Sequence, residues 1–160
     1  MPNKEVLIMQ KLSTILILSC VLGMPTMSFA HRDKPHGSHD AMYGGLVMMY
    51  ADLHFEVVLE EEGGVKLYYS DASRAELPAA VVSKVQVEIL RDDSEAETVV
   101  MNISEAGDYW GGVSTAVSKL KTIVRVAFIF QDEALVFELP AHMFPSIMEQ
   151  KRTARAAHKA

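Results

Sequence analysis

Cysteine is nearly absent from this chain, since Cys20 is the only one among its 160 residues. A single cysteine excludes an internal disulfide and a cysteine-rich zinc site. No run beyond residue 30 is long and apolar enough to predict a membrane-spanning helix, which needs about 20 residues. The domain must therefore be stabilised by an ordinary apolar core.

The sequence motifs of common enzyme classes are also absent. There is no G-x-S-x-G elbow, no Walker loop, no H-E-x-x-H helix and no dinucleotide fingerprint. Basic charge is scarce, because residues 31–160 contain 13 basic and 20 acidic side chains and have a formal charge of −7. Nucleic-acid binding requires a basic surface. We therefore expect a protein that is not an enzyme and does not bind nucleic acid.

The first thirty residues show the three parts of a cleavable signal peptide. Lys4 and Lys11 form a basic start, residues 12–24 are almost wholly apolar, and Ser28-Phe29-Ala30 is a small-residue cleavage pattern. The apolar run is shorter than the about 20 residues of a membrane span. The pattern predicts a signal peptide at 1–30, export to the periplasm, and a mature protein that begins at His31.

Two alternatives concern this leader. Translation from Met9 instead of Met1 would give a tighter basic segment. Ile17-Leu18-Ser19-Cys20 loosely resembles a lipobox, which would make the protein a lipoprotein anchored through Cys20. A lipid at Cys20 would leave the apolar residues 21–30 at the mature N-terminus, so we favour the cleaved, unanchored form.

The remaining chain divides into three segments. Residues 31–43 are polar and lack apolar periodicity, which is typical of a flexible arm. Residues 44–139 alternate in apolar and polar side chains, and residues 140–160 end in a basic, Ala-rich tail that is helical or disordered. Strands are expected near 46–50, 51–59, 65–69, 81–90, 98–103, 109–113, 122–130 and 134–139, with one helical turn at 114–120. The pattern predicts an all-β, antiparallel, immunoglobulin-like β-sandwich of about seven or eight strands, with a small closed barrel as the alternative.

Histidines are concentrated in the arm, where His31, His36 and His39 occur within nine residues. Imidazole nitrogens bind copper and zinc, and a flexible arm can fold around an ion. If cleavage follows Ala30, the α-amine of His31 is a further nitrogen ligand. We therefore predict that these three histidines bind a metal ion; the alternative is a solvated linker that happens to contain them.

A second candidate is the motif Asp52-x-His54-x-Glu56 in the expected strand 51–59. Its three side chains project from one face of a strand, about 6.6 Å apart per step. That spacing is too wide for three ligands of one ion unless another strand or the arm closes in. Alone, the motif favours a solvent-exposed outer face; combined with the arm, it adds three candidate ligands.

The segments Tyr43–Val47, Asp52–Val58 and Gly64–Asp71 resemble a small family of exported bacterial domains. The family pattern is His-Gly-Gly-x-Val, then Asp-x-His-x-Glu-x-Val, then a glycine followed by Leu-Tyr-x-x-Asp. Such domains accompany heavy-metal efflux systems and are similar to stretches near their periplasmic adaptor subunits. The resemblance runs from Tyr43 to about Leu139 and implies a β-sandwich with a periplasmic role in copper or other metal homeostasis. This chain departs from the pattern at Tyr43, where the family has histidine.

Three functional hypotheses follow from these patterns. The first is a periplasmic, non-enzymatic accessory protein that binds or handles a metal such as copper or zinc, and that contacts an efflux adaptor or another envelope complex. The second is an interaction module of an envelope complex in which the arm is only a linker. The third, a copper enzyme that uses His31 as an amino-terminal ligand, is disfavoured because His54 is the only histidine within the expected strands.

Overall fold

The computed structural model describes residues 39–157 of the chain. The predicted signal peptide, His31 and His36 lie outside these residues. The described part contains ten β-strands, one α-helix and two short 3₁₀ turns. The strands are β1 (Leu46–Tyr50), β2 (Leu53–Leu59), β3 (Gly64–Ser70), β4 (Glu76–Leu77), β5 (Ser83–Leu90), β6 (Glu97–Val99), β7 (Asn102–Ile103), β8 (Tyr109–Val113), β9 (Ile123–Phe130) and β10 (Glu133–Pro140). The helix is α2 (Pro145–Ala157), and the 3₁₀ turns are Ala79–Val81 and Ala141–Met143.

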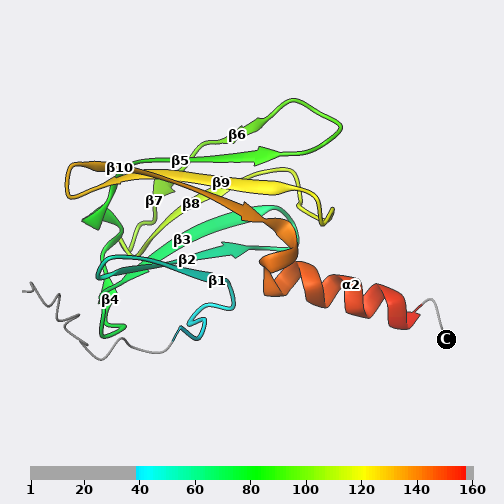
Figure 1. The fold of residues 1–160 in the computed structure, drawn as a ribbon, viewed down its shortest axis with the longest axis horizontal. Helices are drawn as coiled ribbons and strands as arrows, with labels where there is room; N and C mark the ends of the chain where they lie inside the picture. Colours follow the sequence, from blue (N-terminus) through cyan, green and yellow to red (C-terminus); the bar gives the residue numbers. More distant parts are fainter. Residues whose placement is uncertain (1–38, 158–160) are drawn as a thin grey trace, which may run out of the picture. The chain divides into compact units, whose positions relative to one another are not determined.

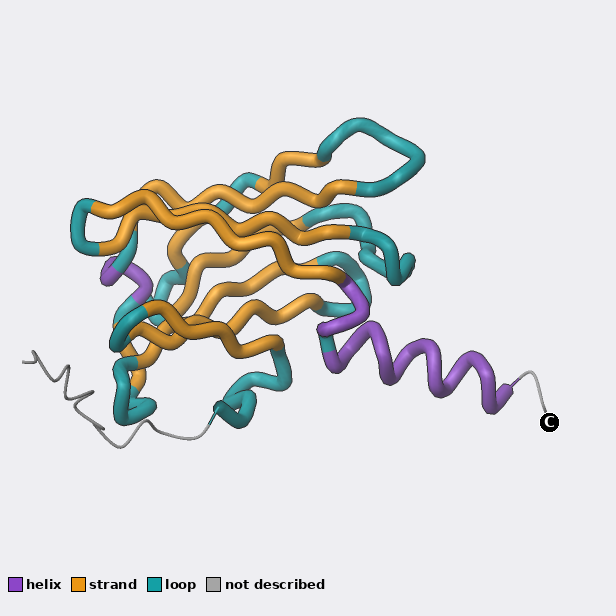
Figure 2. Tube along the Cα trace, in the orientation of Figure 1, coloured by secondary structure: helices purple, strands orange, loops and turns teal. Residues whose placement is uncertain are grey.

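The strands form two antiparallel sheets that lie in two layers (Figure 1). The first sheet has the order β1-β2-β3-β8-β7, with β4 paired to β3, and the second has the order β10-β9-β5-β6. Figure 2 shows the strands of both layers running across the domain and the helix following the last strand. The prediction of an all-β fold built from antiparallel sheets is confirmed.

The core lies between the two sheets and follows the alternation of β2. Leu53, Phe55, Val57 and Leu59 are each at most 4% exposed, as the sequence pattern predicted. The ring of Phe55 meets that of Phe128 from the second sheet edge-on, with centroids 5.3 Å apart. Burying a side chain of this size contributes roughly 1.5–3 kcal/mol, so contacts of this kind hold the two layers together.

Two local predictions are wrong. The expected strand 98–103 is divided between the sheets, because β6 pairs with β5 in one and β7 pairs with β8 in the other. Alternating apolar residues continue through this crossing and do not mark it. The segment 114–120 contains no helical turn. Instead, the Ser114 N–H donates to the carbonyl of Gly63 at 2.9 Å, and the buried Val117 packs into the core.

The body of the domain extends past residue 139. Ala141, Phe144 and Ile147 are at most 2% exposed and belong to the same core as the strands. The start of the predicted tail is therefore part of the packed body, and α2 continues from it with exposed residues from Lys151 onward. Within the described residues no helix is long and apolar enough to cross a membrane.

Candidate metal site

The segment that precedes β1 lies against the face of β2 that points away from the core. We call residues 39–45 the strap. Under it lie His54 and Glu56 of β2, which are 0% and 3% exposed. The solvent-exposed face that the motif alone favoured is not found at these two positions, because the strap lies over the strand. Asp52, at the turn between β1 and β2, is exposed.

Glu56 holds the strap down through its carboxylate. The Oε2 atom accepts the N–H of Met42 at 2.8 Å, and Oε1 accepts the N–H groups of Tyr43 at 2.9 Å and Gly45 at 2.7 Å. A carboxylate only accepts hydrogen bonds, and those to backbone N–H groups are strengthened by its charge. Its lone pairs are thus directed at the strap. The carboxylate of Glu56 therefore fastens the strap to β2, and we do not propose it as a metal ligand.

The two glycines of the strap make this close approach possible. Gly44 has a φ of +77°, in the left-handed region that glycine tolerates best. A Cβ at Gly45 would lie 2.4 Å from the carbonyl oxygen of Val57, which no real side chain can do. The Gly-Gly pair in the family pattern therefore has a structural explanation here: one residue turns the chain and the other lets it pass over β2.

Tyr43 stands where the family pattern has histidine, and it attaches the strap to β3 and β4. Its ring stacks on that of Tyr68 with centroids 3.7 Å apart, and its hydroxyl donates to the carboxylate of Glu76. That hydrogen bond, together with burial and the nearby negative charge, raises the pKa of Tyr43 to about 12. The Nη2 of Arg74 adds a third attachment by donating to the carbonyl of Asp40 at 2.9 Å.

Because the folded state raises the pKa of Tyr43 from its ordinary value of 10.0 to about 12, it favours the neutral phenol. The stabilisation is therefore complete below pH 10 and is lost as the pH rises through about 12. In an ultraviolet titration we expect Tyr43→Phe to lose a tyrosine that ionises at about pH 12, while Tyr69, whose pKa is raised further by burial, stays neutral there in both proteins. Tyr50→Phe is the control: it removes a phenol whose pKa is raised by its own hydrogen bond to Glu133 at 2.6 Å, and it should keep the step near pH 12. Loss of a tyrosine that ionises near pH 10, with the step near pH 12 retained, would contradict this attachment.

The buried His54 is oriented by a loop that follows β3. Its Nδ1 lies 3.1 Å from the carbonyl oxygen of Asp71, which makes Nδ1 the donor by assignment and leaves Nε2 as the basic nitrogen. The Asp71 side chain builds that loop by accepting hydrogen bonds from Ser73 and from the N–H of Ala75 at 2.9 Å. The Ser73 hydroxyl and the Ala75 N–H lower the pKa of Asp71.

The strap brings His39 against His54. Their ring centroids are 5.4 Å apart and the ring planes are inclined at 41°. Two imidazoles that bind one ion at about 2.0–2.1 Å have centroids roughly 4.5–6 Å apart. The pair therefore has the separation of two ligands of one metal ion. His39 is exposed, so an ion can reach the pair from solvent.

The remaining predicted ligands do not complete a site within residues 39–157. That part of the chain holds no group of three His, Cys, Asp or Glu side chains that could bind an ion. His31 and His36 lie outside the described residues. The structure thus provides a pair of histidines, and any further protein ligand must come from elsewhere in the chain.

Asp71 was not among the predicted site residues, although the pattern of the resemblance contains it. Asp71 orients His54 through its backbone carbonyl, and a pattern of side chains does not reveal a backbone contact. The only signal was Asp71-Ala72-Ser73, a pattern typical of a turn in which the aspartate bonds its own backbone.

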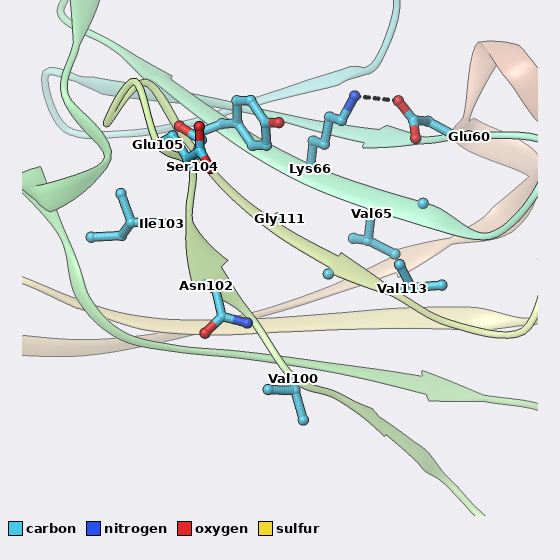
Figure 3. A pocket seen from close by; sticks show the side chains of 13 residues that line it. Glu60, Val65, Lys66, Val100, Asn102, Ile103, Ser104, Glu105, Gly111 and Val113 are labelled. Carbon is cyan, nitrogen blue, oxygen red and sulfur yellow. Dashed lines mark hydrogen bonds and ion pairs between the residues drawn. The ribbon is translucent and has the colours of Figure 1, made fainter.

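A concavity elsewhere on the described domain is a different feature. It measures about 650 Å³ and lies over β3, β8 and β7, with Lys66, Asn102 and Gly111 among its lining residues (Figure 3). The ion pair between Lys66 and Glu60 lies at its margin. None of the predicted metal ligands lines it.

Comparisons with known proteins give no relative from which to transfer a function. No family model, no curated protein and no solved structure matches the chain.

Proposed function

We propose that this protein binds a metal ion, copper or zinc, between His39 and His54, and that it acts as an exported, non-enzymatic metal-handling accessory protein. The observation that carries the proposal is the separation of 5.4 Å between the two imidazole rings. The predicted signal peptide supports a periplasmic location, and the resemblance to efflux-associated domains supports both that location and an immunoglobulin-like form of the sandwich. They also support an efflux adaptor or another envelope complex as the protein partner.

The environment of His54 matches that of a metal-binding histidine. Such a histidine almost always donates its other ring N–H to a carbonyl or a carboxylate, which fixes the tautomer and the ring orientation. Here the carbonyl of Asp71 accepts from Nδ1 at 3.1 Å, so Nε2 is the nitrogen that would bind the metal. A second imidazole lies on the strap beside it.

The arm offers the further ligands that the pair requires. His36 precedes His39 by three residues, and three extended residues reach at most about 10 Å. His36 therefore lies within reach of an ion held by His39, and His31 offers both an imidazole and, after cleavage, an α-amine. Three imidazoles without a thiolate form a ligand set suited to zinc or Cu(II).

We expect calorimetric titration with Cu(II) and with Zn(II) to show at least about a tenfold loss of affinity in His54→Asn and in His39→Asn. Asparagine retains a donor near the position of Nδ1, so His54→Asn can keep the bond to Asp71 while it removes Nε2. His142→Asn is the matched control, because His142 is exposed in a 3₁₀ turn after β10. Unchanged affinity in both variants would refute the site and favour the interaction module.

A further inference from the structure

The edge strands of the two sheets differ in length. The first sheet ends in β1, with five residues, and β7, with two, while β6 at one edge of the second sheet has three. The opposite edge of that sheet is β10, which has eight residues and lies outermost in its layer (Figure 1). Long edge strands expose unpaired backbone groups that attract another strand.

β10 also lacks several of the features that protect an edge, although it carries two glutamates. Natural edge strands carry lysine, proline or a bulge that prevents pairing with another chain. β10 has no lysine, its only proline is the last residue, Pro140, and its register with β9 is continuous. The side chain of Val136, in the middle of the strand, is 62% exposed.

The hairpin geometry determines which backbone groups point outward. The loop between β9 and β10 is Gln131-Asp132, and both residues have positive φ, 49° and 65°. Such a two-residue loop closes on a hydrogen-bonded pair, here Phe130 and Glu133. Every second residue from Glu133 then bonds to β9. The N–H and C=O groups of the residues between them point away from the sheet: Ala134, Val136 and Glu138.

We propose that β10 pairs antiparallel with β10 of a second copy of this chain, about a two-fold axis at Val136. In this register Val136 lies opposite Val136 of the second copy, and Ala134 lies opposite Glu138. All N–H and C=O groups of the three outward residues then find partners. The four-stranded sheet becomes a continuous sheet across the dimer.

Two neighbouring registers are poorer. An axis at Glu138 would place two glutamates directly opposite each other, which is destabilising. An axis at Phe137 would place Ala134 opposite Pro140, which has no N–H to donate. In the proposed register Glu138 faces a small apolar residue, while its own carboxylate is held by Arg125 at 2.8 Å within the same chain. The exposed surface of β10 is therefore complementary to itself.

The test is the oligomeric state of the full chain by sedimentation equilibrium. We expect a dimer for the wild type and monomers for Val136→Lys and Val136→Glu, because each would place two like charges opposite each other. An equimolar mixture of the two variants should dimerise, since lysine then faces glutamate. Val113→Lys, at an exposed valine of the other sheet, should stay dimeric.

A cysteine experiment tests the register separately. In a Cys20→Ser background, Val136→Cys should form a disulfide-linked dimer, because paired residues lie about 5.5 Å apart between Cα atoms. Ala134→Cys should not, since it faces Glu138. A monomeric wild type, a dimer that survives Val136→Lys, or equal crosslinking at both positions would each overturn the proposal.

Discussion

Replacing Glu56 by glutamine should lower the free energy of unfolding by about 3 kcal/mol, because hydrogen bonds to a charged group contribute about 1.5–3 kcal/mol each and a buried donor without a partner is costly. The carboxylate accepts three backbone N–H groups of the strap while it is 3% exposed. Glutamine keeps one acceptor oxygen and directs an NH₂ group at N–H donors. The strap would therefore lose its strongest attachment to β2.

Urea denaturation of wild type and Glu56→Gln measures this effect. Glu62→Gln is the control, since Glu62 is exposed in the turn between β2 and β3, and surface substitutions of this kind usually change stability by less than about 0.5 kcal/mol. Equal stability losses in the two variants would show that Glu56 does not clamp the strap. Because the strap carries His39, Glu56→Gln should also weaken metal binding although Glu56 is not a ligand.

The second large effect is expected at Gly45. Gly45→Ala should cost about 2–4 kcal/mol, since its Cβ would lie 2.4 Å from the carbonyl oxygen of Val57 and the backbone would have to shift. Gly44→Ala should cost only about 1 kcal/mol. There the strain comes from the φ of +77° alone, because no atom lies within 4 Å of the added Cβ.

Thermal unfolding of the two alanine variants separates close contact from backbone strain. We expect Gly45→Ala to melt well below Gly44→Ala and to lose metal affinity as the strap lifts. The reverse order of stability would mean that the strap does not lie against β2 as the structure shows.

The alternation in β2 was enough to predict its core face and the antiparallel architecture. Leu53, Phe55, Val57 and Leu59 read directly as one buried face. The burial of His54 and Glu56 on the opposite face was not predictable, because a polar segment covers them. That covering depends on backbone N–H groups that converge on one carboxylate, and backbone donors leave no periodic signal in the sequence.

The sequence predicted which residues belong to the candidate site, but not what each of them does there. The motif pointed to His54 and Glu56, and the arm pointed to His39. The spacing within one strand could not show that Glu56 holds the strap while His39 reaches His54. Side chains of β2 alone are too far apart to bind one ion together. The strap supplies the second ligand, because it places His39 beside His54.

The central claim is that His39 and His54 bind the same ion, and a double-mutant cycle of metal affinity tests it most directly. It compares Zn(II) dissociation constants of the wild type, His39→Asn, His54→Asn and the double variant. If both imidazoles bind one ion, the double variant should lose less binding free energy than the sum of the two single losses, because either substitution already breaks the shared site. Strictly additive losses, or no loss in either single variant, would contradict the account.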